Sequence, residues 1–167
     1  MIGIASSGLH SNGYSLARRI LADNKLTLES TVDGLLLGPA LLEPTRIYVK
    51  ELLALMKQVR VKGMAHITGS GIPGNLPRCL PDGTKATVFE SKWKRASIFD
   101  VLQQLGSVDR GEMFSAFNMG LGMTVIVSDT DVAPALSTLR QSGLDAWEVG
   151  VIEVGAPNAE ASATVQP

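Results

Sequence analysis

The sequence predicts an α+β domain in which a mixed β-sheet is layered with α-helices, and three observations lead to this class. Short apolar runs alternate along the 167 residues with segments whose apolar residues recur at helical spacing. Long stretches containing glycine and proline interrupt this alternation, which is untypical of a doubly wound parallel sheet. Apolar residues make up 45% of the chain and charged residues 19%, so a chain of this size can bury a real core. We therefore expect one domain over residues 1–155 and a flexible tail over 156–167.

The first third of the chain predicts one strand and two helices around an irregular segment. Residues 2–6 form an apolar run without a basic flank, which is typical of a buried strand and not of a signal peptide. A polar glycine loop leads into a helix that begins at Tyr14 and ends near Asn24. Residues 25–45 carry two glycines and two prolines, so we expect an irregular excursion there. Helical spacing returns over 46–59.

The middle of the chain predicts two strands and two helices. Residues 64–68 read as a strand that runs into a second glycine-rich turn, after which two prolines disfavour regular structure. Residues 84–89 are typical of another strand. Apolar residues at helical spacing predict a helix over 98–105 that Gly106 stops, and a shorter helix follows over 109–116.

The last third predicts a strand, a helix and a final strand. Residues 123–127 form a mostly β-favouring apolar run suited to a central strand. A helix over 130–141 begins after good capping residues and ends before a glycine. Residues 147–154 read as the last strand. The tail, 156–167, lacks periodicity and has one large apolar residue, so we expect it to be mobile.

Charge and composition exclude several classes of function. The 15 basic and 16 acidic residues leave a formal charge of −1, so bulk electrostatics give no support for nucleic-acid binding. No apolar run reaches 18 residues, so we expect no membrane-spanning helix and a cytoplasmic protein. One cysteine cannot form an internal disulfide, and with two histidines it is too few for a common closed zinc site. We predict no metal site within this chain.

Glycine-rich turns beside predicted strands are the candidate binding elements, and they span residues 8–13, 69–74 and 118–122. The first matters most, because a glycine loop that opens a helix directs free N–H groups at an anion. Hydroxyl, amide and imidazole side chains lie in or beside it. A plain helix-capping turn is the alternative interpretation. The spacing matches neither a Walker A loop nor the dinucleotide-binding glycine pattern.

The sequence predicts different environments for the two histidines. His66 lies in an apolar strand, where a core histidine paired with a neighbour is favoured over a ligand or a base. His10 lies in a polar glycine loop with little packing reason to be there. Cys79 has no partner cysteine, so we expect an inert buried thiol. We expect Asp129 and Asp131 to be helix caps and not metal ligands. Two interpretations are open for the basic residues Arg46, Lys50 and Arg78. Each either contacts a phosphate or is an exposed, solvated charge, and the second interpretation is favoured.

Several blocks of this sequence resemble one family in an unbroken order. The first is GLHSNGYSL at residues 8–16, and another is FNMGLGM at residues 117–123. Further blocks lie at residues 42–50, 63–69, 75–81, 98–99 and 112–113. Together they are similar to the C-terminal domain of the aminoimidazole ribonucleotide (AIR) synthetase family, the phosphoribosylformylglycinamidine cyclo-ligases, over residues 1 to about 153.

The resemblance implies a ligase of purine biosynthesis. In that family, phosphoribosylformylglycinamidine (FGAM) is closed to AIR at the expense of ATP, in a cleft between two domains of a homodimeric protein. It implies that ATP and Mg²⁺ are bound mainly by an N-terminal domain that is absent from these residues. The partners expected are that missing domain, FGAM, ATP and a second copy of the full-length protein. We expect the isolated chain to be inactive.

The resemblance and the loop chemistry together give the candidate site residues. We expect His10 to be catalytic, as a donor to the activated amide oxygen. The expected substrate- or phosphate-binding residues are Ser7, Gly8, Ser11, Asn12, Gly13, Gly69, Ser70, Gly71, Asn75 and Asn118. The chain departs from the family at two positions, since Ser70 stands where glycine is usual and Gly74 where glutamate is common.

Two alternative functions remain open on the sequence. One is a non-catalytic, single-domain binding module. The other is the equivalent domain of a related ATP-dependent enzyme, of the FGAM synthetase or selenophosphate synthetase type. The two blocks quoted above favour AIR synthetase among these families.

Overall fold

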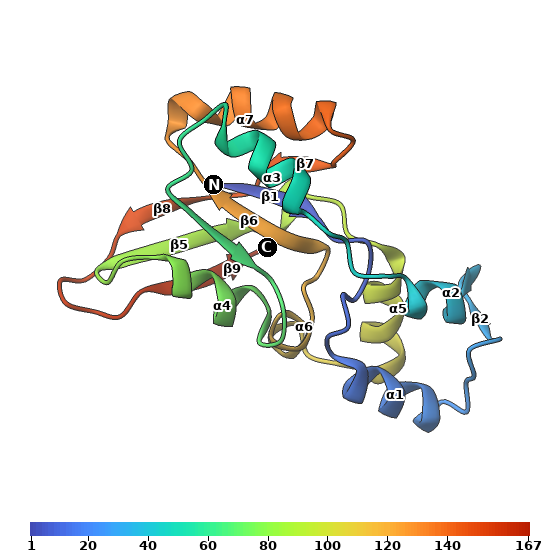
Figure 1. The fold of residues 1–167 in the computed structure, drawn as a ribbon. Coiled ribbons are helices and arrows are strands. Elements are labelled where there is room, and N and C mark those ends of the chain that lie inside the picture. The colour runs from blue at the N-terminus through green and yellow to red at the C-terminus, as the bar shows by residue number, and fades with distance from the viewer.

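A computed structural model describes residues 1–167 and confirms the α+β class (Figure 1). Its strands are β1 (Ile2–Ala5), β2 (Thr31–Val32), β3 (Leu35–Leu36), β4 (Gly63–His66), β5 (Thr84–Phe89), β6 (Leu121–Ile126), β7 (Ala146–Glu148), β8 (Gly150–Val154) and β9 (Ser162–Gln166). Its α-helices are α1 (Tyr14–Asp23), α2 (Leu37–Leu42), α3 (Val49–Met56), α4 (Gly71–Asn75), α5 (Ser97–Gly106), α6 (Arg110–Ala116) and α7 (Asp129–Gln141). Two 3₁₀ turns, η1 (Leu76–Cys79) and η2 (Glu90–Lys92), complete it.

The strands form two principal sheets and one hairpin. The four-stranded sheet has the order β4-β6-β1-β7, and the three-stranded sheet has the order β8-β5-β9. Within the first sheet, β1 and β4 both run antiparallel to β6. Their carboxyl ends therefore lie beside the start of β6, at one edge of the sheet.

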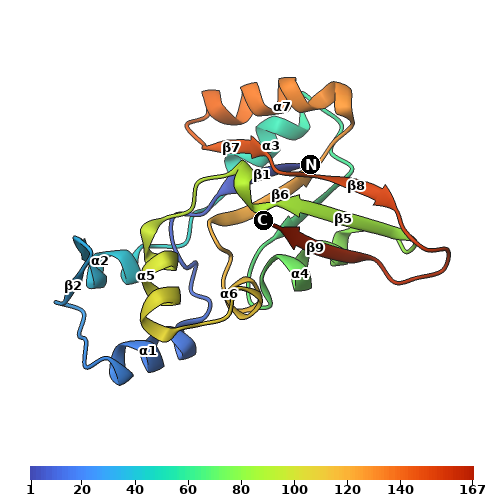
Figure 2. The same cartoon turned by 180° about the vertical axis from the view of Figure 1, so that it is seen from behind.

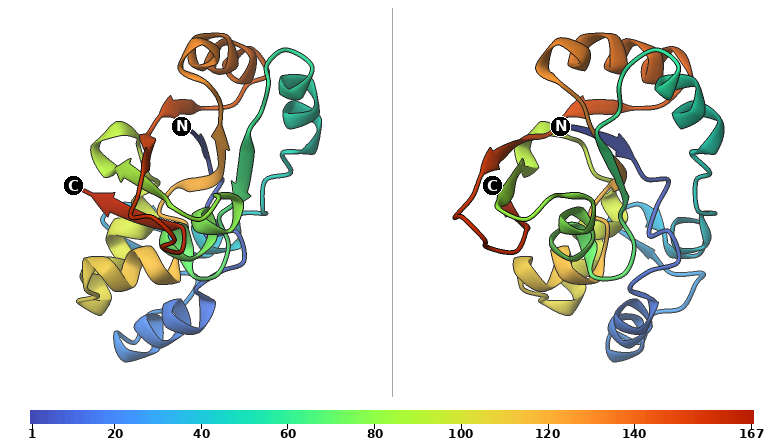
Figure 3. Two further views of the ribbon diagram at one scale, coloured as in Figure 1. Left: turned by 90° about the vertical axis from the view of Figure 1, so that its left-hand side faces the viewer. Right: turned by 60° about the vertical axis from the view of Figure 1, so that its left-hand side comes forward.

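Helices α3 and α7 lie side by side over one face of the four-stranded sheet (Figures 1 and 3). The core beneath them is a cluster of 12 buried residues that joins Leu52 and Leu55 of α3 to Ile2 and Ile4 of β1. A second cluster of 25 buried residues joins the three-stranded sheet to α1, α5 and α6. Helices α1 and α5 pack at the end of the molecule away from β8 (Figure 2).

The single strand expected over residues 147–154 is two strands in different sheets. The chain crosses from the four-stranded sheet to the three-stranded sheet at Val149, which is fully buried between β7 and β8. Gly150 permits the crossing, because a Cβ there would lie 2.1 Å from the Thr87 carbonyl oxygen of β5. A continuous apolar run does not reveal a change of partner sheet.

The expectation that residues 156–167 lack regular structure is wrong. β9 pairs in parallel with β5, so that Val165 lies opposite Val88. Ala163 and Val165 pack against the main core, whereas Ser162, Thr164 and Gln166 are exposed. The alternation of half-buried and exposed residues in β9 is short. The strand is stabilised by hydrogen bonds to β5, about 75 residues away in the chain, and local composition does not show this pairing.

The irregular excursion over residues 25–45 also contains more structure than expected. The β2–β3 hairpin and helix α2 occupy residues 31–42 of it, and Leu37 and Leu41 of α2 are buried in the main core. Among all the helices, none is both long enough and apolar enough to cross a membrane.

Candidate functional site

The glycine-rich turns converge at one edge of the four-stranded sheet. Ala5, at the end of β1, pairs with Leu121, and His66, at the end of β4, pairs with Met123. The turns that follow β1 and β4 therefore flank the turn that precedes β6. A Cβ placed on Gly69 would lie 3.6 Å from the Asn12 side-chain oxygen, so the first two turns are in contact.

The first turn has an unusual backbone. His10, Ser11 and Gly13 all have positive φ angles, of 54°, 61° and 73°. The Asn12 side-chain nitrogen donates to the His10 carbonyl oxygen at 2.7 Å, which helps to hold this conformation. Helix α1 begins directly after Gly13, as expected for a loop that presents N–H groups at a helix start.

His10 is buried, which corrects the expectation that this histidine has little packing reason to be in the loop. Only 3% of the residue is exposed. Its Nε2 accepts a hydrogen bond from the Ser7 backbone N–H at 2.9 Å and lies 3.0 Å from the Ser7 hydroxyl. Since Nε2 accepts, the ring proton of the neutral form is on Nδ1, which has no partner. His10 therefore holds the turn from inside it.

The pKa of His10 is lowered from its usual 6.5 to about 4. Burial is the largest cause, followed by the charges of His66 and Arg46. His10 is thus a neutral ring at pH 7. It neither reaches solvent nor exchanges protons with it near neutral pH.

His66 is exposed, which corrects the expectation of a core histidine. Its ring lies 6.3 Å from the His10 ring and 6.2 Å from the Tyr48 ring, centroid to centroid. Tyr48 is buried, and its hydroxyl donates to the Ala5 carbonyl oxygen at 2.8 Å. Burial raises the pKa of this hydroxyl, so Tyr48 stays protonated. His66 is therefore the ring of this cluster that faces solvent.

Gly122 of β6 makes room for two of these rings. A Cβ there would lie 1.9 Å from the Tyr48 hydroxyl oxygen and 2.6 Å from the His10 Cε1 atom. In the sequence, Tyr48 is only one residue of the range 46–59 with helical spacing, and Gly122 is only the last residue of the third glycine turn. A glycine within a predicted strand can indicate that a large side chain packs against it. Nothing in the residues around Gly122 shows that this side chain is Tyr48, which is 74 positions away in the chain.

Asn75 and Asn118 brace the backbone through side-chain hydrogen bonds to carbonyl oxygens of the turns. The Asn75 side-chain nitrogen donates to the Gly69 and Gly71 carbonyl oxygens at 2.9 and 2.8 Å. The Asn118 nitrogen donates to the Gly8 carbonyl oxygen at 2.8 Å, and its oxygen accepts from the Ser6 hydroxyl and the Gly120 N–H. Both residues are buried. They fix the turns to one another, and Asn75 also lines the cavity beside the second turn.

Gly71 and Gly13 also have packing roles. A Cβ on Gly71 would overlap the Phe114 carbonyl oxygen at 1.7 Å, and a Cβ on Gly13 would lie 2.2 Å from the Phe117 ring. The exposed residues among the candidates are Ser11, Gly69 and Ser70. Ser7, Asn12 and Gly13 are half-buried, whereas Gly8 is buried.

A cavity of about 300 Å³ opens beside the second turn and is lined by His66, Thr68 and Arg78 among others. Arg78 and Lys50 are exposed, as expected for solvated charges, and Arg46 is half-buried near His10. Hydroxyl, imidazole and guanidinium groups in this cavity suit an anion. A second cavity of about 380 Å³ adjoins Ser7 and Gly8 on the side of α2.

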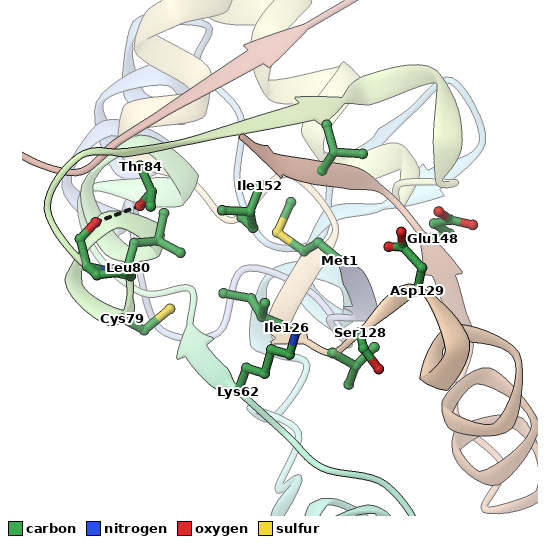
Figure 4. Close-up of a pocket in the computed structure, with 13 residues that line it drawn as sticks. Met1, Lys62, Cys79, Leu80, Thr84, Ile126, Ser128, Asp129, Glu148 and Ile152 are labelled. Carbon is green, nitrogen blue, oxygen red and sulfur yellow. Dashed lines mark hydrogen bonds between the residues drawn. The ribbon is translucent and has the colours of Figure 1, made fainter. Parts of the chain in front are cut away.

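The largest cavity, of about 690 Å³, lies between the two sheets and away from these turns (Figure 4). Met1 and Ile152 lie at its centre, and Asp129 and Glu148 lie together at one end. Carboxylates at an exposed rim do not suit an anionic ligand. Cys79 lies at the other end, half-buried, with its thiol donating to the Leu76 carbonyl oxygen. Burial raises the pKa of this thiol, which agrees with an unreactive cysteine.

The acidic residues do not gather into a metal site. No group of three or more His, Cys, Asp and Glu side chains lies close enough to hold a metal ion. Asp129 and Asp131 lie in the first turn of α7, where Asp131 accepts a hydrogen bond from the Ser128 hydroxyl at 2.6 Å. The cap position is Ser128, so the expectation that Asp129 and Asp131 are caps is corrected: both lie inside the first turn, where their negative charge favours the helix start.

Ser70 and Gly74 are sterically coupled within the second turn. Ser70 has φ 76°, which directs its Cβ toward α4, and a Cβ on Gly74 would lie 2.4 Å from it. We expect Gly74→Ala to destabilise the chain by about 1–3 kcal/mol, the usual range for overpacking. Ser70→Gly removes the obstructing atom and also favours the positive φ. The double variant Ser70→Gly, Gly74→Ala is therefore expected to be close to the stability of Ser70→Gly alone.

Urea unfolding of the parent chain, both single variants and the double variant measures this coupling as a double-mutant cycle. Gly34→Ala is a comparison without a packing conflict, because a Cβ at Gly34 meets nothing within 4 Å and only its positive φ of 79° adds a cost, of about 1–2 kcal/mol. Equal costs of Gly74→Ala with and without Ser70 would show that the two residues are independent.

Comparisons with known proteins agree with this architecture. Residues 1–159 match the family described as "AIR synthase related protein, C-terminal domain". Among solved structures, the thiamine-monophosphate kinase from Stenotrophomonas maltophilia covers 97% of this chain with a TM-score of 0.63 and 16% identity. The one from Aquifex aeolicus covers 99% with a TM-score of 0.55. At this identity the two kinases share the fold.

Curated relatives are much closer in sequence. A phosphoribosylformylglycinamidine cyclo-ligase of Myxococcus xanthus is 59% identical over all of this chain and 49% of its own length. The proteins of the same name from Anaeromyxobacter dehalogenans and Caldicellulosiruptor bescii are 56% and 48% identical over 94% and 93% of the chain. The chain spans about half the length of these relatives. It belongs to the AIR synthase related family and corresponds to that family's C-terminal domain.

Proposed function

We propose that this chain is the C-terminal half of an ATP-dependent cyclo-ligase that converts FGAM to AIR in purine biosynthesis. The observation that carries the proposal is the 59% identity to the Myxococcus xanthus cyclo-ligase over the whole chain. Identity at this level to proteins named for that reaction favours it over a related enzyme or a binding module. In this proposal residues 1–155 form the domain, and the edge with the glycine turns is one wall of the active site.

The chemistry of this edge suits an anionic substrate. Ser7, Ser11 and Asn12 offer polar side chains from the first turn, and Ser70 offers a hydroxyl from the second. With Gly8, Gly13 and Gly69, they form the proposed substrate wall, because small residues let the backbone approach a phosphate. Gly71, Asn75 and Asn118 support that wall from behind.

The roles of the two histidines follow from their exposure. We propose that His66 is the ring that touches substrate and exchanges a proton, because it reaches the cavity beside the second turn. His10 is then a positioning residue, which acts by fixing Ser7 and the turn. This replaces the expectation that His10 itself donates to the substrate.

ATP and magnesium belong to the other half of the protein in this proposal. The residues of this chain do not fit a magnesium site, since no cluster of carboxylates is present to bind a hard cation. The catalytic unit is therefore the two halves together. We further propose, from the family resemblance, that the full-length protein is a cytoplasmic homodimer.

The test joins this chain to the N-terminal half of the Myxococcus xanthus relative, in place of that protein's matching half. We expect AIR to form from FGAM and ATP with the joined protein and not with this chain alone. His66→Ala is expected to lower kcat by about 10²–10⁴, the usual contribution of a proton-transfer group. Gln141→Ala, an exposed change on α7, is the control and should leave the rate unchanged.

Turnover by the chain alone would contradict the assignment of ATP to the other half. A joined protein that folds but forms no AIR would contradict the proposed reaction. Full activity of His66→Ala would show that His66 is a surface residue without a part in catalysis.

A further inference from the structure

Helix α3 carries an apolar stripe that no part of this chain covers. Val49, Leu53 and Met56 are 62%, 55% and 52% exposed, and their spacing of four and three residues places them on one side of the helix. The neighbouring side carries Leu52 and Leu55, which are buried against the four-stranded sheet. We call Val49, Leu53 and Met56 the α3 stripe.

The stripe is unusual for a helix on a protein surface. Surface helices normally carry polar residues on the side away from the core, and one helix with two apolar sides is normally covered on both. Ile47, just before the helix, is 80% exposed and extends the apolar surface. Adjacent large apolar residues at such exposure mark an interaction surface, whereas scattered ones do not.

The stripe adjoins the candidate site. Tyr48 lies between Ile47 and Val49 in the chain, and its ring is 6.0 Å from that of His10 and 6.2 Å from that of His66. A partner seated on the stripe therefore reaches the edge of the site. No group of side chains at that edge can hold a metal ion, so a partner on the stripe is placed where its own side chains can complete the site.

We propose that the α3 stripe is the surface on which the N-terminal half of the full-length protein packs. The length of the relatives supports this occupant, because the chain accounts for only 46–49% of their length and the rest of such a protein is large enough to cover the stripe. Interfaces between domains of one chain bury roughly 600–1,500 Å² and draw on apolar residues of this kind. The inference rests on the proposed function, in that it takes the missing half to complete the same site.

Cysteine labelling tests the proposal without relying on activity. Cys79 is first replaced by serine, whose hydroxyl can donate to the Leu76 carbonyl oxygen in the same way. Leu53→Cys is then placed in the isolated chain and in the protein joined to the N-terminal half of the Myxococcus xanthus relative, whose own cysteines are also replaced by serine. The reaction rate with a thiol reagent is measured in both.

We expect the Leu53→Cys thiol to react at least tenfold more slowly in the joined protein. Val154→Cys is the matched control, since Val154 is an apolar residue with 93% exposure at the end of β8, away from α3. Its rate should stay within twofold in the two proteins. Met56→Cys repeats the measurement at a second position of the stripe, in case one variant folds poorly.

Equal rates for the stripe thiols in the two proteins would overturn the proposal. Protection that already appears in the isolated chain and rises with its concentration would also overturn it, because the occupant would then be a second copy. The labelling experiment can fail independently of the proposed reaction. A joined protein that forms AIR while its stripe thiols stay reactive refutes only the docking surface, and a protected but inactive protein refutes only the reaction.

Discussion

Gly71→Ala is expected to unfold the domain or to reduce its stability by more than about 4 kcal/mol. A Cβ at this position would lie 1.7 Å from the Phe114 carbonyl oxygen and 3.0 Å from that of Phe117. Both obstructing atoms are backbone, so no side-chain rotation relieves the overlap, and α6 would have to move away from the second turn. The positive φ of 56° adds strain for any residue with a Cβ.

Gly143→Ala separates these two causes. Gly143 also has a positive φ, of 80°, but a Cβ there meets nothing within 4 Å. Its alanine variant is expected to lose only about 1–2 kcal/mol, the cost of the left-handed conformation. Circular dichroism and urea unfolding measure both variants. Similar losses at the two positions would show that packing against α6 is not what requires glycine at position 71.

His10→Ala is expected to destabilise the chain by about 2–4 kcal/mol. The change leaves a cavity beside Tyr48, and it removes the acceptor of the Ser7 N–H. His66→Ala should have little effect on stability, because His66 is exposed. Thermal and urea unfolding of the two variants compare them directly. A larger loss for His66→Ala would contradict the assignment of His10 as the structural histidine.

The same histidine gives the chain a defined pH dependence. The pKa of His10 is about 4 in the folded chain and about 6.5 when it is unfolded. Between these values the unfolded chain binds a proton that the folded chain does not, so stability falls as the pH falls from 6.5 to 4. A tenfold change in proton affinity is worth about 1.4 kcal/mol, so the loss approaches ~3 kcal/mol at pH 4.

His10→Gln isolates this contribution. The glutamine amide oxygen can accept the Ser7 N–H and does not titrate. The stability difference between the parent chain and His10→Gln should therefore shrink or change sign as the pH falls from 6.5 to 4, by up to the amount above. A difference that is constant with pH would show that His10 titrates normally in the folded chain.

The sequence predicted the elements whose pattern is local. The helices that became α1, α5, α6 and α7 were found because their apolar residues recur every three or four positions and their ends carry stop or capping residues. The strands that became β1, β5 and β6 were found because short apolar runs end in turn residues. The first glycine turn was selected as a candidate from its composition and stays a prediction, whereas the family was predicted from residue blocks and the comparisons confirm it.

What the sequence alone could not determine depends on contacts between distant segments. His10 lies in a polar loop and His66 in an apolar strand, yet His10 is buried and His66 is exposed. The reason is that residues 44–48 cross over the first turn, bringing the Arg46 backbone and the Tyr48 ring to His10, whereas His66 lies at the end of a strand.

The same cause explains the other differences. The tail forms β9 because β5 offers it a free edge, and the last strand divides at Val149 because its two halves belong to different sheets. Asn75 and Asn118 brace the turns because the carbonyl oxygens that they reach lie on other parts of the loops. Periodicity and composition are properties of residues that are neighbours in the chain. They indicate which residues favour burial and which backbone conformations have a low free energy. Exposure and hydrogen-bond partners are properties of the packed chain, and only the tertiary structure determines them.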